Sequence, residues 1–329
     1  MSATANPCAR MRHPARGFTL IELLISLAIG LVILAAGLSV FATSSRSSQL
    51  SEIETQMNED GILALNLVQQ QLKQAGFSQQ LIPSNGATVM GNYAGPAVRG
   101  CDGGFTDAAA AFDQLSCVKG DGSDAIAIRY EATPDNTIPL LTDPTVATNC
   151  LGNSILPLTP TQVSPRPTPA AGTSLADHYT LADNRYLVID AKTTPMLSCR
   201  GMEKRNTANI IGAPQPLLAN VESMQIRYGV ASRPSAELAA TYDPLLHQIV
   251  DYHEASDVDK LSETIEDRWG RVLSVRVCLL MRSDRPVRDA PEGGMTYKRC
   301  DNADETGTDG YLRRTYTTTV LLRNRLIAP

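Results

Sequence analysis

The longest apolar stretch of the chain lies near its N-terminus, at residues 18–42, with the sequence FTLIELLISLAIGLVILAAGLSVFA. Its 25 residues contain one ionisable side chain, that of Glu22. An α-helix rises about 1.5 Å per residue, so roughly 20 apolar residues cross the hydrocarbon core of a bilayer. The stretch therefore predicts a single transmembrane helix, to which we assign residues 18–43.

Basic residues gather on the N-terminal side of this stretch. Arg10, Arg12, His13 and Arg16 precede it, whereas the residues that follow it, 43–45, are Thr-Ser-Ser. The positive-inside bias then places the short leader in the cytoplasm and the C-terminal bulk of the chain outside. A secretory signal peptide would have an apolar region of about 7–15 residues followed by an A-x-A-like site, so ordinary signal-peptidase cleavage is not expected.

A helical pattern continues beyond the membrane segment, over residues 44–76. No proline interrupts it, and apolar residues recur at helical intervals, including Ile53, Met57 and Val68. Gly61 is an isolated weak point inside the pattern, and Gly76 is well placed to cap the C-terminus of the helix. We expect an amphipathic continuation of the transmembrane helix whose apolar face packs on the rest of the protein.

After Gly76 the sequence changes to short β-rich segments separated by Gly, Asn, Pro and Asp. Residues 273–279 alternate between apolar and polar side chains, as a half-buried strand does. The predicted strands are residues 124–130, 185–190, 221–230, 271–281 and 311–323. The expected fold class is α+β: a long N-terminal helix on a mainly antiparallel sheet built by residues 77–329, with loop insertions near 156–173 and 232–260.

Charge argues against a general nucleic-acid-binding role. The full chain has 329 residues and a formal net charge of -5. Without residues 1–17 it would keep 26 Lys and Arg against 34 Asp and Glu, a net charge of -8. Proteins that follow phosphate backbones need a basic face, so no nucleic-acid partner is predicted.

The cysteines indicate disulfides in an oxidising compartment. One of the seven, Cys8, lies in the leader, and no two of the other six have the C-x-x-C spacing of a zinc or redox site. Six buried thiols are the alternative, and six cysteines allow 15 pairings. Because short loops close most easily, the chain order favours three bridges: Cys101 to Cys117, Cys150 to Cys199, and Cys278 to Cys300.

Motifs for catalysis or for a cofactor are absent from the sequence. It contains no phosphate-binding P-loop, no H-E-x-x-H helix and no G-x-S-x-G elbow. The polar surroundings of His178, His247 and His253 favour solvated side chains. Residues 301–310 are acidic but lack EF-hand spacing, so a solvated turn is favoured over a calcium site. Residues 121–124 are interpreted as a turn. We expect no enzyme, no cofactor and no metal site.

Glu22 is the unusual feature of the apolar stretch. A carboxylate at mid-membrane costs on the order of 2.5–3.5 kcal/mol, which a simple signal anchor does not explain. Residues 16–22, RGFTLIE, resemble the signature of type IV prepilins and of type II secretion pseudopilins. The resemblance implies that prepilin peptidase cuts between Gly17 and Phe18 and N-methylates Phe18. It also implies that Glu22 meets the N-terminal ammonium of a neighbouring subunit in the assembled filament.

The remainder of the chain resembles the PilW family of minor pilins, which is related to the J-type minor pseudopilins. The resemblance rests on residues 74–77, 123–126, 221–229, 275–280 and 320–325. It implies a single-pass protein of the inner membrane with a periplasmic head, which enters the pilus filament or its tip. The implied partners are prepilin peptidase, other minor pilins, the major pilin and a tip adhesin.

Three functions are compatible with these features. The favoured function is a minor pilin that takes part in priming and assembling a type IV pilus. The second is a minor pseudopilin of a type II secretion system, and the third is an exposed subunit that binds DNA or adheres to a surface. The first two share every N-terminal feature, so gene neighbourhood would separate them.

Overall fold

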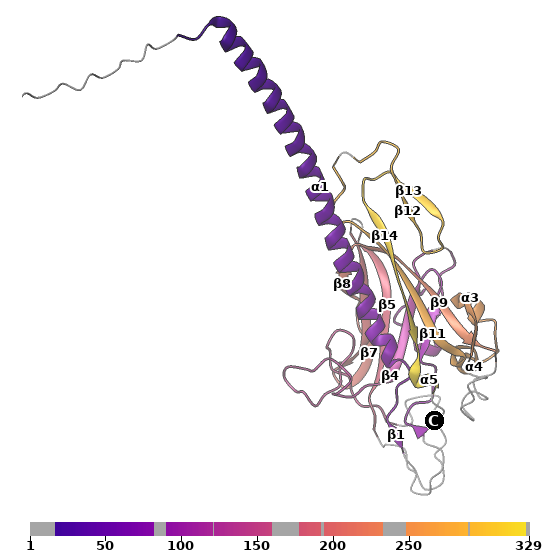
Figure 1. The fold of residues 1–329 in the computed structure, drawn as a ribbon. Helices are drawn as coiled ribbons and strands as arrows, with labels where there is room; N and C mark the ends of the chain where they lie inside the picture. The colour runs from indigo at the N-terminus through magenta and orange to yellow at the C-terminus, as the bar shows by residue number, and fades with distance from the viewer. Residues whose placement is uncertain are drawn as a thin grey trace, which may run out of the picture. The chain divides into compact units, whose positions relative to one another are not determined.

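The computed structural model describes residues 17–81, 90–120, 122–159, 178–191, 194–232, 248–288 and 290–326 (Figure 1). The chain divides between Glu52 and Ile53 into two compact units. The predicted insertion at 156–173 lies mostly outside the described residues, as do His247 and the leader before Gly17.

The first unit contains the apolar part of helix α1, which runs from Leu20 to Gln74. Its large apolar side chains are exposed to solvent, with Leu20 at 80% and Leu38 at 68%. This helix is long and apolar enough to cross a membrane. Within the described part of this unit, no other element covers this apolar surface.

In the second unit, α1 is amphipathic. Its buried residues follow one another at intervals of three or four positions: Ile53, Met57, Gly61, Ala64, Val68 and Leu72. The helix ends at Gln74, and Gly76, two residues further on, has a φ of 73° and donates its N–H to the carbonyl of Arg129 at 2.8 Å. The predicted amphipathic continuation and its glycine cap are therefore confirmed.

The C-terminal segment closes the same end of α1. The side-chain amide of Asn324, in α5 (Arg323–Leu326), donates to the carbonyls of Lys73, Gln74 and Ala75 at 3.2–3.3 Å. The last carbonyls of a helix have no hydrogen-bond donors within the helix, and the amide of Asn324 is the donor here.

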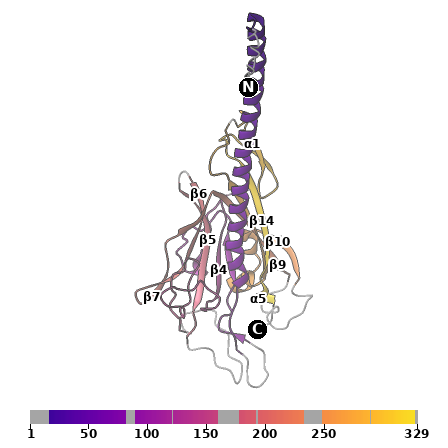
Figure 2. The same cartoon turned by 60° about the vertical axis from the view of Figure 1, so that its left-hand side comes forward.

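Two antiparallel sheets form the rest of the second unit. The first has the order β3 (Val98–Cys101), β4 (Ala125–Glu131), β5 (Leu181–Ala191), β6 (Thr194–Arg205), β7 (Ala208–Ile211), and β8 (Gln215–Ala219) also pairs with β6. The second has the order β10 (Ile249–His253), β9 (Val221–Ala231), β11 (Val272–Arg282), β14 (Arg313–Leu321). Figure 2 shows residues 53–74 of α1 between β4–β7 on one side and β9, β10 and β14 on the other.

Smaller elements complete the described chain. They are β1 (Gln80–Leu81), β2 (Met90–Gly91), the 3-10 helix η1 (Phe112–Gln114), α3 (Ala255–Val258), α4 (Ile265–Gly270), β12 (Met295–Lys298) and β13 (Asp304–Gly307). The strands β1 and β2 pair with each other, as do β12 and β13.

The α+β fold class and the five predicted strands are confirmed, with ends that differ by a few residues. Two predictions were wrong. The supposed loop at 232–260 contains β10, which pairs with β9, and α3, which buries Ala255 and Val258. The supposed turn at 301–310 contains β13, whose pairing with β12 was not visible in its acidic sequence. The long strand β6 was missed because Pro195, Gly201 and its charged end hide the alternation.

One hydrophobic core joins the helix to both sheets. It includes Val68 and Leu72 of α1, Ile128 of β4 and Val277 of β11, all fully buried. Burying a side chain of this size stabilises the fold by about 1.5–3 kcal/mol. The core therefore holds α1 and the two sheets together as one cooperative unit.

Gly61 is an essential part of this packing, and the sequence-based description of it as a weak point was wrong. A Cβ atom at Gly61 would lie 2.6 Å from the ring of Tyr316 in β14. The Tyr316 hydroxyl also donates to the side-chain oxygen of Asn58 at 2.6 Å. The absent side chain allows an aromatic ring to lie directly on the helix backbone.

We predict that Gly61→Val lowers the thermal unfolding midpoint of the purified, detergent-solubilised protein. Overpacking of this kind costs about 1–3 kcal/mol because Tyr316 cannot move away without losing its contacts. Asn66→Val, at an exposed position of the same helix, is the matched control and should leave the midpoint nearly unchanged. Equal midpoints for the two variants would show that the ring does not depend on Gly61.

Candidate assembly site

The predicted cleavage site lies just before helix α1. Gly17, Phe18 and Thr19 are not helical, and the side chain of Phe18 is 84% exposed. A side chain at Gly17 would meet nothing within 4 Å in the described structure. The peptide bond between Gly17 and Phe18 is thus accessible in this unit, and a glycine offers no obstruction there.

Glu22 lies in the first turn of α1. Its backbone N–H donates to the hydroxyl of Thr19 at 3.3 Å, so Thr19 satisfies one of the free donors at the helix start. A carboxylate in the first turn also interacts favourably with the helix dipole. No described residue forms an ion pair with Glu22, whose side chain is exposed.

Three disulfides brace the second unit. They join Cys101 to Cys117, Cys150 to Cys199, and Cys278 to Cys300, the same pairs that the chain order favoured. Each connects a strand of one of the two sheets to a connecting segment outside it. A disulfide typically contributes about 2–4 kcal/mol by restricting the unfolded chain.

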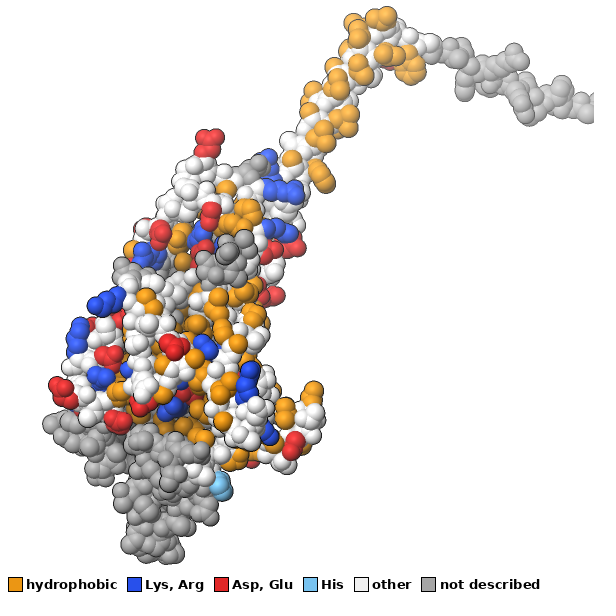
Figure 3. Space-filling model, turned by 180° about the vertical axis from the view of Figure 1, so that it is seen from behind, with side chains coloured by type: hydrophobic (Ala, Val, Ile, Leu, Met, Phe, Trp, Pro, Cys, Tyr) orange, Lys and Arg blue, Asp and Glu red, His pale blue; other side chains and the backbone are white. Residues whose placement is uncertain are grey.

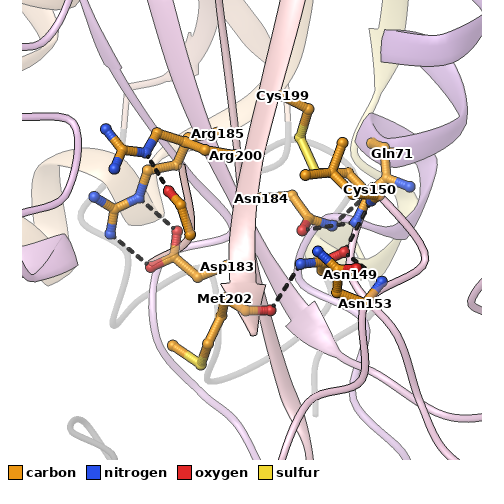
Figure 4. Close-up of a disulfide and its surroundings, with 12 residues drawn as sticks. Gln71, Asn149, Cys150, Asn153, Asp183, Asn184, Arg185, Cys199, Arg200 and Met202 are labelled. Atoms are coloured by element: carbon orange, nitrogen blue, oxygen red, sulfur yellow. Dashed lines mark hydrogen bonds and ion pairs between the residues drawn. A yellow bond between two sulfur atoms is a disulfide. The ribbon is translucent and has the colours of Figure 1, made fainter. Parts of the chain in front are cut away.

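A buried polar network connects α1 to the first sheet. Asn184 of β5 donates to the side-chain oxygen of Gln71 in α1 at 2.8 Å, and the hydroxyl of Tyr130 donates to the same oxygen at 3.1 Å. The oxygen of Asn184 accepts the backbone N–H of Cys150 at 3.1 Å. Figure 4 shows Gln71 and Asn184 beside the disulfide between Cys150 and Cys199. A fully satisfied network of this kind fixes the position of the helix on the sheet.

The opposite face of β5 carries an ion pair. Asp183 lies against Arg185 at 2.9 Å, as Figure 4 shows, and against Arg129 at 3.1 Å. Burial opposes ionisation, but the two guanidinium groups hold the pKa of Asp183 below its ordinary value. Removing one partner of such a pair leaves an uncompensated charge, at a cost of about 3–5 kcal/mol.

The arginines on this face of the first sheet hold residues 108–115, which we call the covering segment, in place. Arg185 donates to the carbonyls of Ala108 and Ala110, and Arg99 donates to those of Phe112 and Leu115. Their donors are therefore used by the protein's own backbone. The arrangement is that of a structural clamp over the first sheet.

Of the histidines that follow the leader, the structure describes His178 and His253. His178 is exposed in a connecting segment and His253 lies in the edge strand β10. Among the described residues, no three His, Cys, Asp or Glu side chains lie close enough to hold a metal ion. In the acidic hairpin, Asp304 pairs with Lys298, and Asp301 and Glu305 pair with Arg299.

Asp124 joins the two sheets, a role that the sequence did not reveal because the residue was interpreted as part of a turn. Its carboxylate accepts the backbone N–H groups of Ile226 at 2.7 Å and Gly103 at 3.3 Å. Its own N–H donates to the carbonyl of Met224 at 2.7 Å. Burial, with smaller contributions from nearby carboxylates, raises the pKa of Asp124 to about 7 despite these bonds.

We predict that the protein becomes more stable as the pH falls from 8 to 5. The folded pKa of Asp124 exceeds its unfolded pKa, so the cost of its charge is full above about pH 7 and vanishes near the unfolded pKa. Asp124→Asn should flatten the dependence of the unfolding midpoint on pH, whereas Asp135→Asn, at an exposed position, should not. Parallel pH profiles for Asp124→Asn and wild type would contradict this role.

Comparisons with known proteins bear on both units. Residues 179–324 match the family described as Type IV Pilus-assembly protein W, PilW. Residues 12–38 match the prokaryotic N-terminal methylation motif, a range that includes Gly17, Phe18 and Glu22. Among solved structures, a type IV-like pilin from Thermus thermophilus is 11% identical, with a TM-score of 0.37, and the alignment covers 82% of this chain and 97% of that chain. No curated protein sequence gives a significant match.

Proposed function

Since the chain is a type IV pilin-like protein with a PilW domain and an N-terminal methylation motif, we propose that it is a minor pilin that primes assembly of a type IV pilus and lies at its tip. The observation that carries this proposal is the methylation motif at the start of an exposed apolar helix. The PilW match over residues 179–324 favours a pilus over a secretion pseudopilus.

Processing is the first step of the proposed function. Prepilin peptidase cuts after Gly17 and methylates the new terminus at Phe18. The non-helical segment from Gly17 to Thr19 supports this step, because a protease needs an extended and accessible peptide. Cleavage leaves a cationic terminus four residues before Glu22.

Assembly is the second step. The Glu22 carboxylate of one subunit pairs with the Phe18 ammonium of its neighbour while the apolar helices leave the bilayer together. Two observations support this pairing: Glu22 has no ion-pair partner among the described residues, and the helix around it is apolar on every side. Packed helices exclude water, which strengthens the attraction between the two charges.

Location and partners follow from the same proposal. The basic leader stays in the cytoplasm, the helix anchors the subunit in the inner membrane, and the second unit folds in the periplasm. The three disulfides of the structure support an oxidising compartment. The partners are prepilin peptidase, other minor pilins, the major pilin and a tip adhesin.

We predict that Gly17→Trp blocks processing, because the indole obstructs the position where glycine enters the protease. Mass spectrometry of the membrane-derived protein should show wild type beginning with N-methylated Phe18 and the variant keeping residues 1–17. Gly17→Ala, which adds one methyl group, is the control and should be impaired less. An intact leader on wild type, in cells with active prepilin peptidase, would sink the processing step.

We predict that Glu22→Ala inserts into the membrane but fails in assembly. Deleting the gene should reduce surface pili, and deleting the retraction motor as well should restore many of them. In the deletion strain, wild type should restore pilus number, whereas Glu22→Ala and Glu22→Gln should not. The loss of one partner of a buried pair costs about 3–5 kcal/mol, enough to abolish incorporation.

Fractionation distinguishes assembly from stability in this experiment. Both Glu22 variants should be present in the membrane at the level of wild type and absent from sheared pili. Incorporation of Glu22→Ala at the level of wild type would remove the ion-pair mechanism. An unchanged pilus number in the deletion strain would remove the pilus function itself.

A further inference from the structure

The loop between β4 and Cys150 carries an exposed apolar apex, which we define as residues 138–141, Ile-Pro-Leu-Leu. The side chain of Leu141 is fully exposed, at 102%, and that of Ile138 is 52% exposed. Pro139 is also exposed, and Leu140 is half-buried. In Figure 3 this loop forms the protrusion with apolar side chains at the lower right.

Hydrogen bonds and a disulfide hold the loop in one shape, and the apex contributes backbone carbonyls to them, not its apolar side chains. The N–H of Thr148 donates to the hydroxyl of Thr137 at 3.1 Å, and the hydroxyl of Thr148 donates to the carbonyl of Ile138. The side chain of Asn136 donates to the carbonyl of Glu131 at 2.9 Å. The disulfide from Cys150 fixes the end of the loop to β6. A partner would therefore pay little entropy for ordering this surface.

Folding does not explain the composition of the apex. Single exposed apolar side chains are common, but three exposed apolar side chains within four residues are unfavourable unless they have a function. Here the run stands on a braced loop, and Leu141 gains nothing from the fold. The exposed side chains of Ile138 and Leu141 could therefore be buried against a partner.

The charged residues near the apex indicate the kind of surface that it can bind. From Ala132 to Thr159 the charged side chains are Asp135 and Asp143, both exposed, and the segment contains no Lys or Arg. Hydrogen bonds from Thr145 lower the pKa of Asp143, which keeps it ionised. Two carboxylates beside the apolar apex are repelled by an anionic membrane surface and attracted to Lys or Arg.

We infer that the apolar apex docks into an apolar recess bordered by Lys or Arg on the head of a neighbouring pilin-like subunit. The class of partner rests on the proposed function, whereas the chemistry of the recess rests on residues 132–159. Burying Leu141 and Ile138 supplies the affinity, and the two carboxylates select the partner and its orientation.

Photo-crosslinking in cells that assemble pili tests this inference with the full-length chain. A photoreactive phenylalanine analogue replaces Leu141, and in a control protein it replaces Val118, another exposed apolar residue of the second unit. The expected result is a covalent adduct between position 141 and a co-encoded pilin-like subunit, at a peptide where apolar residues adjoin Lys or Arg. Position 118 should give at least tenfold less of this adduct.

Charge reversal supplies the second arm. Asp135→Lys with Asp143→Lys should reduce the adduct from position 141 at least tenfold, while the protein still unfolds in one cooperative transition and is processed at Gly17. Adducts to lipid alone, equal adducts from positions 141 and 118, or adducts insensitive to charge reversal would each overturn the inference. If the subunit enters pili normally in those cases, the proposed function survives and only the docking surface is lost.

Discussion

Burial of one stripe of α1 is the constraint on which the second unit depends. The stripe from Ile53 to Leu72 is the surface on which both sheets meet, so the helix is part of the core and not an appendage to it. Over residues 20–41 the same helix is apolar and exposed. The helix is thus apolar all round in its first part and has a single buried stripe in its second part, and the spacing of its apolar residues marks the change.

Polar groups, and not only apolar ones, determine how the sheets are arranged around that stripe. Gln71 and Asn184 bond across the interface between helix and sheet, and Asp124 bonds the first sheet to the backbone of β9. Asn184 and Asp124 are buried and Gln71 is half-buried, and their side-chain oxygens are paired, so a displaced arrangement would leave donors or acceptors without partners. Apolar burial supplies most of the stabilisation, and these polar contacts make one arrangement the favoured one.

Sequence alone could predict the features that depend on local pattern. The membrane segment, the amphipathic half of α1, the cap at Gly76 and the alternating strand β11 all follow from periodicity and residue type. Features that depend on distant partners could not be predicted. The packing role of Gly61 was not visible because its partner, Tyr316, is 255 positions away. The role of Asp124 was not visible because its carboxylate accepts the N–H of Ile226, in a distant strand. For the assembly site, Gly17 and Glu22 lie within the matched methylation motif, and the roles expected of them remain predictions because they depend on other molecules.

The three consecutive residues 183–185 of β5 have a consequence for strand register. Asp183 and Arg185 face the covering segment, and Asn184 faces α1 between them (Figure 4). A slip of β5 by one position against its neighbours would turn the ion pair toward the apolar core and Asn184 away from Gln71. Both errors leave buried polar groups unpaired, so the slipped alignment is heavily penalised. Asp183, Asn184 and Arg185 therefore favour a single register of β5 with its neighbours β4 and β6.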